Sequence, residues 1–477
     1  MPFAAKSAMI EGKRRQEGIT MLLTDFDASR QAVINPDMLF SPVPDLPETA
    51  VSCFSHVTFE RMLNMAADVR VLAELGDANA KYPVYRGVWQ GTPLTFALAM
   101  VGAPSCVAML EELHALGAKR FVVFGNCGVL NQQIEGGPRT KHGGDDDSDN
   151  SGIIRYVRVE FAGYPFMKDK EINGITFGSV GSGTTIDHLQ VSYSNDDSYE
   201  WFGGSVNCKY LVAYNGWDDE FDTDNGFSGK VQYGLSIRDP RIADTSQSNG
   251  FESDNCADGS LVSPYTTAVF SNITFIGPLG RDAGFTNDES YINAGSFNPN
   301  NGSALGKFQS AMQIRRSSRL NCFNSVAVGY PVGLIIDGEK GNTVEQAQEG
   351  IINLQNIWFA GMTVTGSDAN KVYDDVLYDA VNKTIIDAGQ ESYSSSFFKA
   401  QKGNKVLADM NELNFKDGRG IGVNYMPNAN SPVLTAASFD NALLDNGFDK
   451  VDYIGAFGIN DNWLDGWTNF DPNNTDY

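Results

Sequence analysis

The fold of this chain is decided by a repeated stretch, residues 186–204 (IDHLQVSYSNDDSYEWFGG) followed by residues 208–226 (CKYLVAYNGWDDEFDTDNG). The two copies align at an offset of 22 residues, which superimposes a leucine, a pair of aspartates, an aromatic residue, an acidic residue and a glycine. A third copy follows at an offset of 30, where residues 221–225 (FDTDN) match residues 251–255 (FESDN). Internal repeats of this length are typical of solenoids.

Each unit of this repeat predicts a short strand, a polar turn and another strand. Such a unit cannot bury an apolar face alone, but stacked coils can bury one together. Three later segments fit the same coil: 269–276, 320–328 and 354–361. The rival fold, a β-sandwich, needs antiparallel hairpins with tight turns and would not align acidic turns at a fixed offset. We therefore predict a mainly β fold, a parallel β-helix.

The composition indicates a large folded chain whose second part is strongly acidic. Of 477 residues, 42% are hydrophobic and 20% are charged, which allows a sizeable core and excludes wholesale disorder. No window approaches the roughly 18 apolar residues of a membrane span. Residues 1–134 carry 11 Lys and Arg against 13 Asp and Glu, so most of the net charge of −24 falls on the rest. Phosphates would be repelled there, so we expect no nucleic-acid partner. Cations or neutral ligands with hydroxyls suit this part better.

Acidic residues recur at equivalent turns of the repeat, and we call these columns the acidic ladder. One column holds Asp196, Asp197, Asp218 and Asp219, and another holds Glu200, Asp222 and Glu252 with Asp224 and Asp254 beside it. At one coil spacing, roughly 4.8 Å, carboxylates repel each other unless water solvates them or a cation bridges them. Calcium accepts several carboxylate oxygens at flexible geometry. The candidate cofactor is therefore Ca²⁺, with Asp196, Asp197, Asp218, Asp219, Asp222 and Asp224 as ligands. A solvated acidic face is the alternative.

Aromatic residues lie close to these acids along the sequence. Tyr199, Trp201 and Trp217 are candidates for a sugar-stacking surface, with a place in the core as the alternative. Paired carboxylates also suggest glycoside hydrolysis, which needs two of them at roughly 5–10 Å. Lyase chemistry would need a Lys or Arg base beside the acids, and Lys209 and Lys230 are the near candidates.

The first 130 residues have a different, α/β texture. Strands are predicted over 83–89 and 92–100, a helix over 104–116, and a buried strand over 120–124 that runs into a glycine turn. This order of elements is typical of a parallel α/β sheet.

Three stretches of this segment are distinctive: 21–55 (MLLTDFDASRQAVINPDMLFSPVPDLPETAVSCFS), 101–104 (VGAP) and 124–130 (FGNCGVL). In these stretches the chain resembles the nucleoside phosphorylase family, close to its uridine phosphorylase-like branch. This resemblance implies phosphorolysis of a nucleoside to base and ribose 1-phosphate, with Gly125, Asn126 and Gly128 holding phosphate through a turn. Asn126 stands where the family usually has Ser or Thr. No counterpart of the family's second half follows residue 130, so we expect a partial phosphorylase-like domain.

The remainder resembles exported Bacteroidetes proteins with a right-handed parallel β-helix, often lipid-anchored or on the outer surface. The resemblance is carried by 134–137 (IEGG), 150–165, 171–191, 200–204, 218–229, 249–255 and 448–471. It implies an extracellular or outer-surface location and carries no reaction. Residues 1–20 hold no apolar signal-peptide core and by themselves indicate the cytoplasm. We expect an extension over 1–19, the phosphorylase-like domain over 20–132 and the β-helix over 133–477, joined as a chimera.

Together these features predict a non-catalytic surface or extracellular binding protein. Glycans are the expected ligand, surface proteins are other possible partners, and Ca²⁺ is a candidate cofactor. Two alternatives stay open. One is nucleoside phosphorylase activity through the first part, with phosphate and nucleoside as partners. The other is cleavage of polysaccharide by a lyase or hydrolase site on the β-helix.

Overall fold

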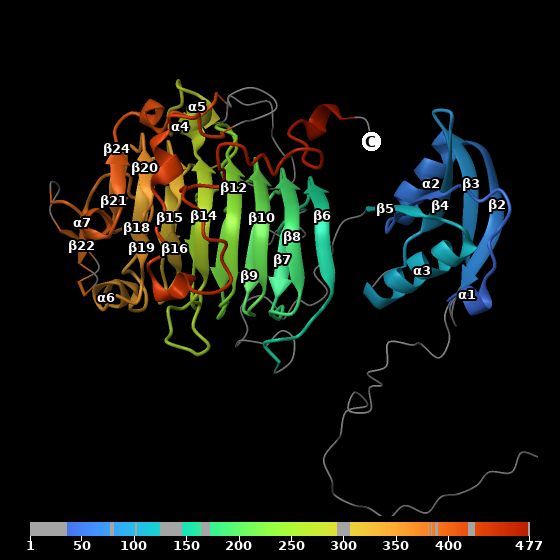
Figure 1. The fold of residues 1–477 in the computed structure, drawn as a ribbon, viewed down its shortest axis with the longest axis horizontal. Helices are drawn as coiled ribbons and strands as arrows, with labels where there is room; N and C mark the ends of the chain where they lie inside the picture. Colours follow the sequence, from blue (N-terminus) through green and yellow to red (C-terminus); the bar gives the residue numbers. More distant parts are fainter. Residues whose placement is uncertain are drawn as a thin grey trace, which may run out of the picture. The chain divides into compact units, whose positions relative to one another are not determined.

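The structure is a computed structural model that describes residues 36–76, 81–100, 103–124, 146–163, 172–292, 306–379, 381–382, 384–386, 390–417 and 425–475. The chain divides into two compact units, Met1–Asn126 and Cys127–Tyr477. Each unit has a hydrophobic core of its own. Their elements are labelled in Figure 1.

The first unit is built on a five-stranded sheet with the strand order β2-β3-β4-β1-β5. The strands are β1 (Thr49–Cys53), β2 (Ala67–Gly76), β3 (Lys81–Trp89), β4 (Thr92–Leu98) and β5 (Arg120–Phe124). The helices are α1 (Pro36–Leu39), α2 (His56–Met65) and α3 (Ala103–Leu116). Side chains of α3, including Leu113 and Leu116, pack in one cluster with Ala50 of β1.

The predicted strands and helix of this unit are confirmed, but the sheet is mixed and not purely parallel. Strand β1 pairs in parallel with β4 and β5, whereas β3 pairs antiparallel with β2 and β4. The connection from β3 to β4 explains the difference. It consists of Gln90 and Gly91, with φ of 47° and 81°, and a two-residue turn with positive φ joins antiparallel strands only.

The second unit is a stack of coils whose strands form two long sheets (Figure 1). The ten-stranded sheet holds β6 (Ile153–Glu160), β8 (Thr185–Ser192), β10 (Asn207–Tyr214), β12 (Lys230–Ile237), β14 (Val269–Ile276), β16 (Asn321–Phe323), β17 (Val326–Val328), β19 (Leu354–Gln355), β20 (Trp358–Ala360) and β24 (Lys405–Leu407). The seven-stranded sheet holds β7 (Ile175–Gly178), β9 (Tyr199–Phe202), β11 (Phe221–Asp224), β13 (Phe251–Ser253), β15 (Ser310–Ile314), β18 (Val332–Ile336) and β21 (Val364–Ser367). All pairs within these two sheets are parallel.

Short elements decorate the coils of the second unit. A small antiparallel sheet joins β22 (Leu377–Asp379) to β23 (Thr384–Ile386). The helices are α4 (Pro278–Arg281), α5 (Glu289–Ile292), α6 (Thr343–Gln348) and α7 (Tyr393–Ala400). Four 3-10 turns lie nearer the C-terminus: η1 (Met410–Leu413), η2 (Pro432–Thr435), η3 (Ala442–Leu444) and η4 (Pro472–Asn474).

The strand register reproduces the alignment read from the repeat. Leu189 lies opposite Leu211, and Asp222 lies opposite both Glu200 and Glu252. The parallel β-helix is therefore confirmed, because successive coils contribute parallel strands to both sheets. A stack of coils buries the apolar faces of all its units in one continuous core, which includes Trp201 and Phe270.

The glycine at the end of each repeat has a steric reason. Gly204 has φ of +83°, and a Cβ there would lie 2.6 Å from the backbone nitrogen and oxygen of Val180 in the preceding coil. Gly226, its equivalent one coil later, also has positive φ. Residues other than glycine adopt this conformation at a cost in free energy. The glycines therefore allow the chain to turn sharply close to the backbone of the preceding coil.

The C-terminal segment 425–475, which we call the strap, packs on the outer face of the ten-stranded sheet. Trp463 and Leu464 of the strap belong to one apolar cluster with Tyr214 and Tyr233 of the sheet. Polar contacts follow the same path: the side chain of Gln190 donates to the carbonyl of Asn469 and accepts from its amide. In Figure 1 the strap is the red trace in front of the strands. The strap therefore covers the outer face of the ten-stranded sheet.

Candidate functional site

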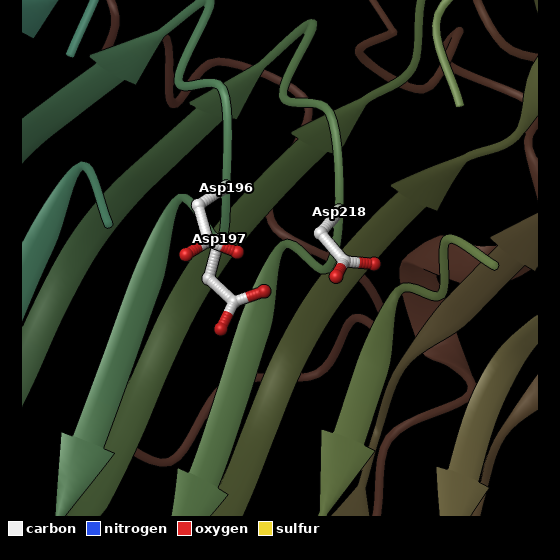
Figure 2. A group of neighbouring side chains, drawn as sticks. All are labelled: Asp196, Asp197 and Asp218. Atoms are coloured by element: carbon white, nitrogen blue, oxygen red, sulfur yellow. The ribbon is translucent and has the colours of Figure 1, made fainter. Parts of the chain in front are cut away.

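Carboxylate side chains lie close together at the turns that connect strands of the ten-stranded sheet to strands of the seven-stranded sheet. The turn from β8 to β9 supplies Asp196 and Asp197, and the next turn, from β10 to β11, supplies Asp218. One carboxylate oxygen of each lies within 4.8 Å of the others. Figure 2 shows the three side chains on these neighbouring turns.

A second group shares a residue with the first. Asp197, Glu200 at the start of β9 and Asp222 on β11 also place carboxylate oxygens within 4.8 Å of one another. We call the five residues of the two groups the carboxylate corner: Asp196, Asp197, Glu200, Asp218 and Asp222. Four of the six predicted cation ligands are thus brought together. Asp219 and Asp224 belong to neither group, and Glu200 joins through its place in the ladder.

Backbone amides of successive coils hold the acidic turns in register. The amide of Asp219 donates to Asp197 Oδ1 at 3.0 Å, and the amide of Asn249 donates to Asp219 Oδ1 at 2.5 Å. Asp219 therefore links its own turn to the turns of the two neighbouring coils. The hydroxyl of Ser246 donates to Asp218 Oδ2 at 2.7 Å and to Asp244 Oδ1 at 2.8 Å. These contacts fix the carboxylates before any ligand arrives.

Two carboxylate oxygens of the corner have no hydrogen-bond partner among the described residues. They are Asp218 Oδ1 and Asp222 Oδ1, which are buried. A buried polar atom without a partner costs about 1–3 kcal/mol, more if it is charged. Calcium binds oxygens at about 2.3–2.6 Å, so its ligands lie up to roughly 5 Å apart. The separations in both groups fit this range, and the residue types fit a hard divalent cation.

The corner is electrostatically strained when all its acids are ionised. Burial, together with the charge of Asp196, raises the pKa of Asp197 well above its usual value. Burial and the charge of Asp219 raise the pKa of Asp218, and burial and Glu200 raise that of Asp222. Burial also raises the pKa of Glu200, which accepts a hydrogen bond from Asn173. A bound cation would favour the ionised forms and relieve the repulsion.

Arginines that the sequence reasoning missed lie beside the acidic ladder. Arg315, just after β15, is bonded to Glu252 and lies 2.8 Å from Asp254 Oδ1, and Arg316 lies 2.5 Å from Asp254 Oδ2. The repeat read from the sequence ends at residue 255 and did not indicate them. The pairing of β13 with β15 places Glu252 opposite Gln313, and so brings Arg315 level with Asp254 across 61 residues. The two arginines therefore balance the negative charges of Glu252 and Asp254 at this end of the ladder.

A fully buried arginine supports the corner from inside. The Arg238 guanidinium pairs with Glu220 at 2.5 Å, and both side chains are inaccessible to solvent. Arg238 also donates to the carbonyls of Asp218 at 2.7 Å and Trp217 at 3.1 Å. It thereby fixes the backbone of the turn that carries Asp218.

Two sequence hypotheses about this site are wrong. Tyr199, Trp201 and Trp217 are 0% exposed, because inward positions of a coil meet the core, so they cannot stack on a sugar. The Tyr199 hydroxyl, for example, donates to the carbonyl of Leu189. Lys209 and Lys230 do not lie beside the acidic ladder: they contact Asp449 and the carbonyl of Asn446. The acidic ladder itself is partly buried: Asp197 is 7% exposed, whereas Asp196 and Asp218 are half-buried. The predicted phosphate-binding residues, Gly125, Asn126 and Gly128, lie outside the described residues.

Among the described helices, none combines the length and the apolar character needed to cross a membrane. A family model described as a pectate-lyase-like beta helix domain matches residues 125–402, which is more than half of the chain. This match covers the carboxylate corner and the coils on both sides of it.

Nucleoside phosphorylases are similar to a smaller part of the chain. Guanosine phosphorylase of Halorubrum lacusprofundi is 26% identical over 121 residues, which cover 25% of this chain and 48% of that protein. Uridine phosphorylase of Thermococcus kodakarensis is 28% identical over 126 residues, 25% of this chain and 42% of that protein. The solved uridine phosphorylase of Vibrio fischeri is 27% identical and covers 18% of this chain and 37% of that one, with a TM-score of 0.16. The chain spans less than half the length of the curated relatives it matches.

Proposed function

The chain belongs to the pectate-lyase-like beta helix family, and from that premise we propose that it binds a polysaccharide at the carboxylate corner through a divalent cation such as Ca²⁺. One observation carries the proposal. The corner gathers five carboxylates from two successive coils, and two of their oxygens, Asp218 Oδ1 and Asp222 Oδ1, are buried without a hydrogen-bond partner in the described chain. A cation would satisfy those oxygens and balance the charge.

The cation also explains how so acidic a surface could hold a glycan. Uronate units would be repelled by the ionised corner, whereas a bound cation offers them positive charge and open coordination positions. Neutral sugars would meet the same cation through hydroxyl oxygens. Polysaccharide outside the cell is the ligand class that this family membership favours, so we propose an extracellular or outer-surface location as well.

Glycan-array binding with calcium and with chelator tests this function. The full chain should bind a set of acidic polysaccharides, and chelation should abolish most of that binding. Asp218→Asn should weaken it, because the substitution removes a charge while keeping an oxygen for the Ser246 hydrogen bond. Asp445→Asn, an exposed aspartate of the strap, is the matched control and should bind as the wild type does. Equal binding with and without chelator would contradict the proposal.

Cleavage of the polysaccharide is the second candidate, and Arg315 is the observation that favours it. Lyases remove a proton next to a uronate carboxylate while the bond to the leaving sugar oxygen breaks, which leaves a double bond in the sugar ring. Such a reaction needs a cationic or basic group beside the acids. Arg315 lies there, and burial together with the charge of Arg316 lowers the pKa of its guanidinium.

Ultraviolet absorbance of the unsaturated product separates cleavage from binding alone. If the chain is a lyase, polygalacturonate with calcium should gain absorbance, and Arg315→Lys should slow the gain while binding persists. If absorbance stays flat with every acidic polysaccharide that binds, the protein is a binding protein only.

A further inference from the structure

A pocket of about 390 Å³ lies in the second unit, lined by the half-buried rings of Phe285 and Tyr373 and by Tyr330, whose ring is buried in the core. Phe285 follows α4, Tyr330 lies between β17 and β18, and Tyr373 follows β21. Pockets that bind small ligands usually have volumes of roughly 300–1,000 Å³ and apolar or aromatic walls with a few polar groups. The size therefore suits one or two sugar rings.

Among the described residues that line the pocket, none has a charged side chain, and a nearby cation, Lys307, lies 5.8 Å from the centre of the Tyr373 ring. Its polar members are Thr286, Asn287 and Thr363, which offer hydroxyl and amide groups. Asn287 is held in place because its side chain donates to the carbonyl of Phe308 at 2.9 Å and accepts from the amide of Phe308 at 3.1 Å. Aromatic faces beside fixed neutral hydrogen-bonding groups suit an uncharged ring with hydroxyls and an apolar face. A uronate would find no charge partner among the lining residues.

The pocket and the carboxylate corner share one edge of the coil stack. Both form where chain passes from the ten-stranded to the seven-stranded sheet, and Tyr330 lies three coils beyond Asp218. Three coil spacings amount to roughly 14 Å. One loop touches both places: Ser246 donates to Asp218, and the next residue, Gln247, accepts from the Tyr373 hydroxyl at 2.7 Å. A polysaccharide of a few units lying along this edge would reach both.

We propose that this aromatic pocket binds an uncharged sugar unit of a polysaccharide. Another unit of the same polysaccharide binds at the carboxylate corner. The inference rests on the proposed polysaccharide function and narrows its ligand to a chain that carries neutral units. Binding in the pocket is independent of a cation, because none of its lining groups is a carboxylate.

Calorimetry with neutral tetrasaccharides of xylose, glucose and galactose, and with tetragalacturonate, tests the inference on the full chain. Each titration is run with calcium chloride and with EDTA. At least one neutral tetrasaccharide should bind equally well in both conditions. Tyr373→Ala and Phe285→Ala should each weaken that binding about tenfold, because each removes a stacking face. Asp445→Asn, at an exposed aspartate of the strap, should leave it within about twofold.

Two further variants exclude indirect effects. Tyr265→Ala removes a half-buried tyrosine, stacked with Arg319, that does not line the pocket, and it should bind neutral tetrasaccharides as the wild type does. Tyr373→Phe keeps the ring but loses the hydrogen bond to Gln247, so it should bind within about threefold of the wild type. If Tyr373→Phe and Tyr373→Ala lose affinity equally while melting alike, the loop and not stacking is responsible, and the inference is wrong.

The outcomes also separate this inference from the proposed function. If tetragalacturonate binds with calcium while no neutral tetrasaccharide binds, the proposal for the carboxylate corner is supported and the proposal for the pocket is contradicted. If neutral sugars bind, depend on Phe285 and Tyr373, and ignore calcium, while tetragalacturonate never binds, the pocket stands and the cation proposal fails. Unchanged neutral-sugar binding in Phe285→Ala and Tyr373→Ala overturns the pocket directly.

Discussion

Replacing one acid in each group of the carboxylate corner should stabilise the second unit when no cation is present. Asp218→Asn and Asp222→Asn keep the side-chain shape and remove one charge each. Both residues have an oxygen that is buried without a hydrogen-bond partner in the described chain, so neither substitution breaks a contact at that atom. The wild type should instead gain stability from calcium, and the variants should gain less.

The structure sets the size of the effect. The carboxylate oxygens of each group lie within 4.8 Å of one another, and two unit charges at that limit repel by about 3.5 kcal/mol at an effective dielectric constant of 20. Partial protonation relieves some of this, so about 2 kcal/mol per substitution is expected at neutral pH. Unfolding entropy of about 2.1 cal/mol/K per residue over Cys127–Tyr477 makes about 0.7 kcal/mol equivalent to 1 °C. Each variant should therefore melt about 3 °C higher in EDTA.

Calorimetric melting with EDTA and with rising calcium measures both parts of the prediction. Calcium at 100 times its dissociation constant stabilises by about 2.7 kcal/mol, which corresponds to about 4 °C for the wild type. The double variant should shift by less than half of that. The exposed control Asp445→Asn should melt and respond as the wild type does. If wild-type melting ignores both calcium and chelator, or if both variants melt lower than the wild type in EDTA, the reasoning is refuted.

Four other measurements follow from the same structure. Burial raises the pKa of Asp219 and of Asp337 to about 6, so the folded state binds protons more tightly than the unfolded state, and stability should fall as pH rises from about 4 to 6. The loss of stability is about 3 kcal/mol per group. A series of melting curves in EDTA at increasing pH measures it, and unchanged stability between pH 4 and 6 would contradict the prediction. Arg238→Met should cost about 3–5 kcal/mol because it strands a buried Glu220, while the double variant with Glu220→Leu should recover most of this in denaturant titrations. Trp463→Ala should cost about 3–5 kcal/mol, seen in the same titrations, because this strap residue is 8% exposed and stacks on sheet and strap rings. Uridine or inosine with phosphate should yield no free base above background, since the chain spans less than half of the phosphorylases it matches; steady turnover would contradict this.

Residue spacing alone was enough to predict the coil stack. Successive coils place equivalent residues opposite each other in parallel strands. A match at an offset of 22 or 30 residues therefore predicts neighbouring positions, as Asp222 beside Glu200 and Glu252 confirms. In the first unit, the strands over 83–89 and 92–100 were predicted because the residue pattern that marks a strand is local. The mixed sheet was missed, since which strands become neighbours in that unit depends on contacts distant in sequence.

The sequence by itself thus determined the parallel coils and the stacking of acidic turns, because both follow from a short-range pattern repeated along the chain. Tertiary structure alone decided which side chains of a turn point into the core and which converge at the surface. It placed Trp201 and Trp217 inside, brought Arg315 from a coil 61 residues later against Asp254, and laid the strap over one sheet face. These outcomes depend on side-chain direction and long-range packing, which residue spacing along the chain does not encode.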